Sequence, residues 1–297
     1  MAWKDNQLIG FSVKNLDEIN RVMKFGVNMM EINPHCMAQS GFPLYSYENR
    51  SFVPNGINLT YLKNLLKGVV VQIHLPTETT VSINIEKGLN VCVKEHQDII
   101  LDWLVMFERI YRKYRLGSVL TWHPPVFSEN NNEIFSEKYA LKKAKRFFMK
   151  LDGIRIKYGY RTKIAIENMT HPKVKAGNLG YQPNHFKKML CDTRTFGLTI
   201  DTGHLRLATK ADFANYLALG IPIFNFHFNG NGGVFNPNDW SDDEHLLPRP
   251  GNVSGYKKYP QYFRRHRTPI VLEISHLENY SDAELKDFLK KLKKQIA

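Results

Sequence analysis

Nine residues of the kinds that bind divalent metal ions lie at or after the ends of short apolar segments. Their side chains are imidazoles and carboxylates, which suit zinc, manganese and iron. The set comprises His74, His123, Glu167, Asp201, His204, His227, Asp243, His245 and Glu273. One strand-end histidine alone is more often a hydrogen-bonded core residue than a ligand. Nine such residues placed alike predict a metal-dependent enzyme.

Two glutamates of the set interrupt segments that are otherwise apolar. Glu167 lies in IAIEN, and Glu273 lies in IVLEIS. A carboxylate inside such a segment is expected to be buried, and burial of an unpaired charge is costly unless a metal ion or a cation compensates it. These two glutamates are therefore the strongest individual candidates for metal ligands.

Two short motifs add spacing to residue type. In the segment DTGH, Gly203 favours a turn that places Asp201 and His204 three residues apart, where they can serve neighbouring metal ions. The alternative is an ordinary strand-to-helix turn with Asp201 as the helix cap. Asp243 and His245 lie on the same side of an extended loop, as a chelating pair would, although a solvated acidic loop explains them equally well.

The elements that must position these residues alternate between strand and helix. Short β-rich runs occupy 8–13, 27–33, 69–74, 118–123, 163–168, 197–202, 222–228 and 269–275. Stretches with helical spacing of apolar residues occupy 15–25, 58–67, 94–115, 136–158, 183–191, 210–219, 255–266 and 282–295. Eight such units without a linker predict an α/β fold, a (β/α)8 TIM barrel that spans 1–297 as a single domain. In such barrels the loops after the strands carry the chemistry, and the nine residues lie there.

The composition sets limits on location and on the type of site. The chain is 43% hydrophobic and 23% charged, with no apolar run near the roughly 20 residues that a membrane span requires. Its first residues match neither a signal peptide nor a transit peptide, which predicts a cytoplasmic protein. Cys36, Cys92 and Cys191 lie far apart in the sequence, which argues against disulfides and against a thiolate metal site.

The formal net charge of +13 suggests a nucleic-acid partner, but its distribution argues otherwise. The densest basic segments are 109–115, 142–146, 155–163, 256–267 and 290–294. They fall on predicted outer helices and on the turns that precede strands, whereas the loops after the strands are close to neutral. The basic electrostatic footprint of a DNA-binding surface is therefore missing where DNA would have to lie.

On the basis of the nine predicted ligands and their places at the strand ends, the chain resembles the xylose isomerase-like barrel superfamily. Within it the chain resembles endonuclease IV, the abasic-site DNA endonuclease with three metal ions. Besides the nine residues, GNLGYQPNHFKKML (177–190) and HLLPRPGNV (245–253) are similar to stretches of that family. The resemblance implies two or three divalent ions, zinc above all, with manganese or iron as alternatives. The implied ligands are His74, His123 and Glu167 for one ion, Glu167, Asp201, His227 and Glu273 for the second, and His204, Asp243 and His245 for the third.

The sequence departs from that family where the family contacts DNA. The loop HLPTETTVSIN lacks the family's DNA-entering Tyr and Asn pattern, and NPHCMAQSGF lacks the Arg that follows NP. The fourth predicted strand ends in WHPP instead of His-Leu-Gly. These departures leave the metal ligands intact and weaken the prediction of duplex recognition.

The leading prediction is a metal-dependent hydrolase of phosphodiester or phosphate-ester bonds, for which the resemblance implies DNA with an abasic site as substrate. Glu167 would bridge two ions and Glu273 would orient the attacking water, with His204 as a third catalytic residue. The alternative is an isomerase or epimerase of a small sugar or sugar phosphate, which in this superfamily uses one ion held by four residues.

In that alternative the ion would be held by Glu167, Asp201, His227 and Glu273. The two glutamates would also move protons, and His204 with Arg249 would bind the substrate. A third interpretation is a non-catalytic nucleic-acid-binding barrel that uses its basic exterior.

Overall fold

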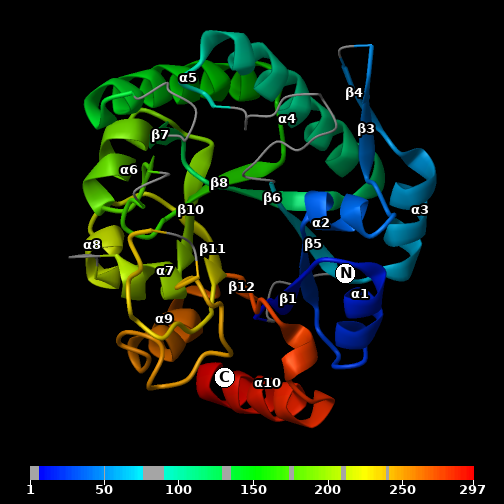
Figure 1. The fold of residues 1–297 in the computed structure, drawn as a ribbon. Helices are drawn as coiled ribbons and strands as arrows, with labels where there is room; N and C mark the ends of the chain where they lie inside the picture. The colour runs from blue at the N-terminus through cyan, green and yellow to red at the C-terminus, as the bar shows by residue number, and fades with distance from the viewer. Residues whose placement is uncertain are drawn as a thin grey trace.

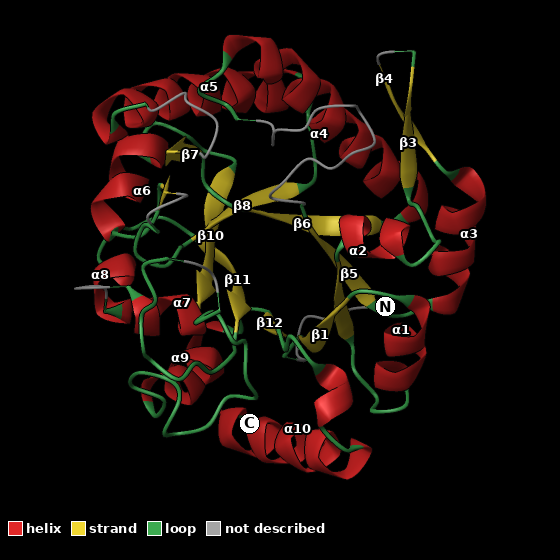
Figure 2. Ribbon diagram, in the orientation of Figure 1, coloured by secondary structure: helices red, strands yellow, loops and turns green. Residues whose placement is uncertain are grey.

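The computed structural model describes residues 7–49, 51–75, 90–128, 135–173, 177–208, 212–238 and 241–297. Eight parallel strands in this part of the chain close into one barrel (Figure 1). Helices surround the strands on the outside, as the view coloured by secondary structure shows (Figure 2). The predicted (β/α)8 TIM barrel is confirmed.

The barrel strands follow the chain around the ring. They are β1 (Ile9–Val13), β2 (Met29–Ile32), β5 (Val70–His74), β6 (Leu116–Trp122), β8 (Lys163–Glu167), β10 (Phe196–Asp201), β11 (Ile223–His227) and β12 (Ile270–Leu272). Each pairs in parallel with the next, and β1 closes the ring against β12, where Phe11 lies opposite Leu272. Every strand lies within two residues of a predicted run.

The outer helices likewise match the predicted stretches. They are α1 (Leu16–Met23), α3 (Gly56–Leu65), α4 (Lys94–Tyr114), α5 (Glu137–Lys157), α6 (Pro183–Leu190), α8 (Phe213–Leu217), α9 (Lys258–His266) and α10 (Asp282–Ile296). Local sequence explains several starts: Ser136 caps α5, and Ser281 forms a capping box with Glu284 at the start of α10. The basic segments noted above lie largely on these helices.

Short elements in the loops after the strands were not predicted. They are α2 (Pro34–Gln39), β3 (Tyr45–Glu48), β4 (Ser51–Pro54), β7 (Val126–Ser128), β9 (Gly177–Asn178), α7 (Thr202–Leu207) and the 3-10 turn η1 (Leu277–Asn279). The strands β3 and β4 form an antiparallel hairpin outside the barrel, and β7 pairs in antiparallel fashion with β9, which lies in a different loop. Elements of two to six residues are too short to show a period in sequence.

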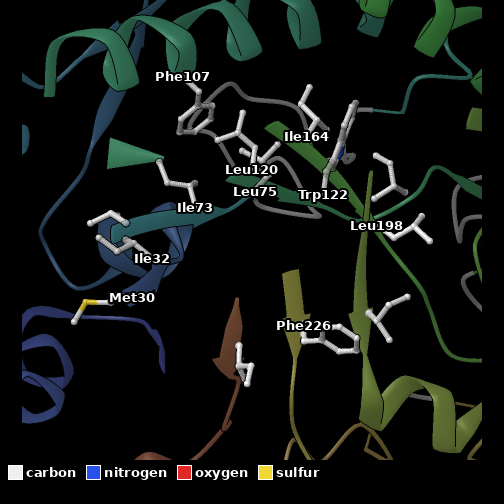
Figure 3. Packing of buried hydrophobic residues seen from close by; sticks show 14 of the residues in the cluster. Met30, Ile32, Ile73, Leu75, Phe107, Leu120, Trp122, Ile164, Leu198 and Phe226 are labelled. Carbon is white, nitrogen blue, oxygen red and sulfur yellow. The ribbon is translucent and has the colours of Figure 1, made fainter. Parts of the chain in front are cut away.

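Alternation along the strands sends apolar and polar side chains in opposite directions. One face packs into the hydrophobic core between strands and helices (Figure 3), including Ile32, Ile73, Leu120, Ile164, Leu198 and Phe226. The alternate positions face the barrel interior, because successive side chains of a strand point to opposite sides. Those positions include Glu31, His74, Thr121, Glu167, Thr199 and His227, all buried. A period of two therefore gathers the polar residues of separate strands at one place.

The fold does not test the predicted domain bounds or the predicted cytoplasmic location. None of the described helices is long and apolar enough to cross a membrane. The domain bounds 1–297 and the cytoplasmic location remain predictions. The segment 76–89, which holds most of the loop compared above with a DNA-contacting loop, lies outside the described residues.

Candidate metal centre

The nine predicted ligands meet at the carboxyl end of the barrel. His74, Glu167, Asp201 and His227 are the last residues of β5, β8, β10 and β11, and His123 and Glu273 directly follow β6 and β12. His204 lies on α7, and Asp243 and His245 lie on the long loop between β11 and α9. All nine side chains belong to one network of contacts below 4 Å, and their role as metal ligands remains a prediction.

Glu167 is the centre of this network. Its Oε2 lies 3.4 Å from His74 Nε2 and 3.2 Å from His123 Nε2. Its Oε1 lies 3.0 Å from His227 Nδ1 and 3.6 Å from His204 Nδ1. The carboxylate is fully buried, so imidazoles on both sides balance its charge. This geometry is that of a carboxylate able to bridge two cations.

Four residues from four strand ends form one compact group. Glu167, Asp201, His227 and Glu273 each offer one ligand atom, and these atoms all lie within 4.8 Å of one another. His227 Nδ1 is the shared neighbour, at 2.8 Å from Glu273 Oε2 and 3.9 Å from Asp201 Oδ2. Three carboxylates and one imidazole at this spacing could hold a divalent cation.

A second group adjoins the first through Asp201. Asp201, His204 and His245 also offer ligand atoms within 4.8 Å of one another. Asp243 lies between the two imidazoles, 3.1 Å from His204 Nε2 and 3.0 Å from His245 Nε2. His245 has a left-handed backbone with φ of 44°, which is uncommon for a residue other than glycine and is often found at functional sites.

Buried atoms in the cluster remain without hydrogen bonds, which supports a cation site. Among the described residues, Glu167 Oε2, Glu273 Oε2, Asp243 Oδ1 and His245 Nε2 have no hydrogen-bond partner of suitable geometry. Buried polar atoms are nearly always hydrogen-bonded, so four exceptions at one place need an explanation. The donor set and its spacing fit a divalent ion.

The charges of the cluster shift the pKa values of its members. Burial raises the pKa of Glu167 and Glu273, but imidazoles led by His227 outweigh burial and hold both pKa values well below the ordinary range. Burial lowers the pKa of His74 and His245, but the surrounding carboxylates outweigh it and raise both pKa values to about 9. Protons on the imidazoles thus balance the carboxylates, and a metal ion could take over that role.

For two further residues, burial decides the direction of the pKa shift. It raises the pKa of Asp201 to about 6 against the opposing effect of His204 and His245. It lowers the pKa of His123 in spite of Glu167. A neutral imidazole is the form that binds a metal, so His123 is the histidine most readily available as a ligand near neutral pH.

The structure adds positioning contacts that the sequence analysis did not identify. Asn229 Nδ2 donates to Asp201 Oδ2 at 2.6 Å, and Asn168 Oδ1 accepts from the Asp201 backbone N–H at 2.7 Å. The Asn229 side chain also explains why residue 203 is a glycine, because a Cβ at this position would lie 2.2 Å from Asn229 Oδ1. Glu31 was missed as well, although a glutamate in the apolar run MMEI is the same signal that pointed to Glu167.

A buried ion pair joins two of the loops around the cluster. Lys173 Nζ lies 2.6 and 2.5 Å from the two carboxylate oxygens of Asp242 and donates to the Asn236 backbone carbonyl at 2.7 Å. The ammonium also lies 4.3 Å from the centre of the Phe235 ring. Asp242 directly precedes Asp243, so this pair holds the loop that presents the second group.

Arg249 is not brought into the cluster. Its side chain is exposed, and its charge lowers the pKa of Glu284 at the start of α10 after the stronger effects of the Ser281 hydrogen bonds. Its assignment as a substrate-binding residue remains a prediction.

Comparison with known proteins identified neither a matching family model nor a matching curated sequence. Solved structures match over nearly the whole chain. A D-tagatose 3-epimerase-like protein has a TM-score of 0.64 at 20% identity, and covers 97% of this chain and 99% of its own. A D-psicose 3-epimerase determined with D-fructose has a TM-score of 0.67 at 10% identity, with the same coverage. A xylose isomerase domain-containing protein from Salmonella typhimurium has a TM-score of 0.60 at 13% identity, covering 98% and 97%.

These comparisons correct the leading functional prediction. The phosphodiester hydrolase is contradicted, because the similar structures are named as sugar epimerases or contain a xylose isomerase domain. Abasic DNA as substrate, DNA repair and zinc as the particular metal find no support, and the endonuclease IV type is not specifically shown. The alternative of a sugar isomerase or epimerase is the better supported one. At the level of the fold, the chain is a (β/α)8 TIM barrel like these solved structures.

Proposed function

We propose that the protein is a metal-dependent isomerase or epimerase of a sugar or sugar phosphate. The observation that carries the proposal is the group Glu167, Asp201, His227 and Glu273, with ligand atoms within 4.8 Å at four strand ends of the barrel. Solved structures of the same fold named as sugar epimerases support the assignment of substrate class.

The reaction requires a proton to leave a carbon next to a carbonyl and to return elsewhere. A bound divalent ion would polarise the carbonyl and an adjacent hydroxyl, which makes the hydrogen on that carbon more acidic. A glutamate carboxylate removes this proton and leaves an enediolate. Return of a proton to the opposite face of the same carbon gives an epimer, and return to the neighbouring carbon gives an isomer.

The environments of the two glutamates suggest how they share this work. The low pKa values of Glu167 and Glu273 keep both in the carboxylate form that accepts a proton. Glu273 is 16% exposed, whereas Glu167 is fully buried. We therefore assign the contact with the carbon-bound proton first to Glu273, and to Glu167 the role of ligand and second proton carrier.

Imidazoles line the accessible side of the same group. His123 is 20% exposed and His245 is 14% exposed, both more than His227, which is fully buried. Imidazole N–H groups at the rim can donate to sugar hydroxyls, and they can also donate to a phosphate group. His204 does not share this task, because it is buried on α7 with its Nε2 facing Asp243, and we assign it to holding Asp243 instead.

The number and identity of the ions form part of the proposal. The function requires one ion, at the four-residue group. A second ion at Asp201, His204 and His245 would share Asp201 with the first, as the prediction of two or three ions implies. Three carboxylates with one imidazole suit manganese or magnesium as well as zinc. Elemental analysis of protein purified without added metal counts the ions per chain.

The test is deuterium exchange, because exchange reports proton removal even from a poor substrate. Purified protein loaded with manganese, cobalt, magnesium or zinc is incubated in D2O with D-tagatose, D-psicose, D-fructose and sugar phosphates. Proton NMR then follows the carbon next to the carbonyl. Glu273→Gln is the test variant, and Glu278→Gln is its matched control, since Glu278 is an exposed glutamate five residues further on.

Metal-dependent deuterium incorporation in the wild type and in Glu278→Gln, with loss in Glu273→Gln, is the expected result. No incorporation above the chelated sample with any sugar and any of the four metals would contradict the proposal. Equal exchange in Glu273→Gln and wild type would remove Glu273 from the reaction.

A further inference from the structure

Glu31 is a buried carboxylate beneath the candidate metal centre. It lies in β2, on the opposite side of the barrel from β10, and its side chain is fully buried. Thr121 Oγ1 donates to Glu31 Oε2 at 2.9 Å from β6, and Asn225 Nδ2 donates to the same oxygen at 3.4 Å from β11. Side chains of two other strands thus converge on this carboxylate inside the barrel.

His227 connects this carboxylate to the cluster above it. Its Nε2 lies 3.0 Å from Glu31 Oε1 and 3.2 Å from Glu31 Oε2. Its Nδ1 lies 2.8 Å from Glu273 Oε2 and 3.0 Å from Glu167 Oε1. The two ring nitrogens therefore face two different partners: Nδ1 faces the candidate metal group, and Nε2 faces Glu31.

We infer that Glu31 is a positioning residue that fixes the ring orientation and tautomer of His227 for metal binding. This inference rests on the metal centre of the proposed function. A carboxylate that accepts from Nε2–H leaves the lone pair of Nδ1 free and aimed at the group formed with Glu167, Asp201 and Glu273. Glu31 does not contact the substrate in this role.

The contacts of Glu31 explain why a carboxylate occupies the position. An ionised carboxylate accepts only, whereas the oxygen of a glutamine side chain must share the position with an NH2 group that donates. The Asn225 amide and the His227 N–H both donate toward Glu31. In a glutamine at position 31, the side-chain NH2 group would therefore face one of these two donors and could not accept from it. Thr121 can adapt, because its hydroxyl can also accept, and it lies 3.3 Å from Thr199 Oγ1.

The test measures metal affinity without any sugar. The affinities of wild type, Glu31→Gln and Glu31→Leu for cobalt and manganese are determined by competition with a chelating indicator, and unfolding of the metal-free forms is followed in parallel. Glu108→Gln is the matched control. Glu108 is also buried and accepts from Thr162 and from the backbone of Arg161, just before β8 at the opposite end of the barrel.

We expect Glu31→Gln to weaken cobalt affinity by about 10-fold and Glu31→Leu by up to about 100-fold, as loss of a carboxylate behind a metal-binding histidine typically does. Glu108→Gln should stay within about 2-fold of wild type even where it unfolds more easily. In nitrogen-labelled, zinc-bound protein, NMR should show that the proton of the His227 ring is on Nε2, and the absence of this ring signal in His227→Asn assigns it to His227.

Wild-type affinity in Glu31→Gln, or equal losses in Glu31→Gln and Glu108→Gln, would overturn the inference. A proton on Nδ1 of metal-bound His227 would do the same. If Glu31→Leu does not fold, Glu31→Gln and the NMR measurement decide. Failure of sugar turnover alone leaves these results unchanged, so it separates the proposed reaction from the role of Glu31.

Discussion

Replacement of Lys173 by Met tests whether the buried pair with Asp242 holds the loop that carries Asp243 and His245. The side chains of Lys173 and Asp242 are 1% and 3% exposed, and the ammonium lies within 2.6 Å of both carboxylate oxygens. Methionine keeps the length of the side chain and removes its charge. Asp242 then remains buried without its cation.

The expected loss follows from this geometry. Removal of one partner of a buried ion pair costs about 3–5 kcal/mol, because the other charge is left uncompensated. The Asn236 backbone N–H still donates to Asp242 at 2.6 Å and partly compensates its charge. We therefore expect a loss of unfolding free energy near the lower end of this range, about 3 kcal/mol. Urea unfolding of metal-free protein measures the difference. The double variant Lys173→Met with Asp242→Asn should lose less than Lys173→Met, since the uncompensated charge is gone.

Lys145→Met is the matched control. Lys145 pairs with Asp192 at 2.6 Å on the surface, with side chains 40% and 48% exposed, and solvent screening leaves such exposed pairs with little effect on stability. Similar losses in the two lysine variants would refute the argument that burial makes the Lys173 pair important. Unchanged metal binding in a destabilised Lys173→Met would show instead that the pair holds the loop without arranging its ligands.

Three further predictions concern the metal centre. Glu273→Gln should lower turnover by at least about 100-fold while the protein stays folded, because a positioned base contributes roughly 10²–10⁴-fold; kinetics beside circular dichroism checks this. His123→Ala should remove one ion in elemental analysis and spare the others if more than one is bound, and an unchanged count of one would limit the site to a single ion. The pKa values of His74 and His245 are raised from 6.5 to about 9, so their contribution to the stability of chelated protein is complete below about pH 6.5 and is lost as pH rises toward 9. Thermal unfolding across this range should show that loss, and added metal should reduce it.

The fold was predictable because its signals are local and repeated. Each predicted strand run holds six or seven residues of alternating or apolar character, and each outer helix shows its own period. The position of the ligands follows from the same alternation, since His74 and Glu167 end their strands on the inward side. The short elements within the loops lacked enough residues for a period, and α7 was predicted only as a turn.

The site was only partly predictable. Glu31 carries the same signal as Glu167, a glutamate in an apolar strand, and could have been found by the same argument. The contacts of Asn229 and the pairing of Lys173 with Asp242 join segments that lie far apart in the chain, so no local pattern reveals them. The left-handed backbone of His245 likewise depends on its surroundings.

The wrong prediction of a phosphodiester hydrolase has a physical origin. Histidines and carboxylates specify that a cation can bind, but the same ligand types serve hydrolysis and proton transfer alike. The resemblance to a nuclease therefore supported a metal site, but it did not justify predicting phosphodiester hydrolysis or a DNA substrate. The near-neutral charge of the loops after the strands, together with the altered segment WHPP, was the evidence in the sequence that favoured a small substrate.

Asp201 serves two purposes at once. Its Oδ1 accepts the backbone N–H of His204 at 2.6 Å and so caps α7, while its Oδ2 lies in the candidate metal group. A cation that draws this carboxylate into a fixed orientation therefore also restrains the first turn of α7. Amide hydrogen exchange at His204 should slow when metal is added, so that local opening of one short helix reports the occupancy of the site.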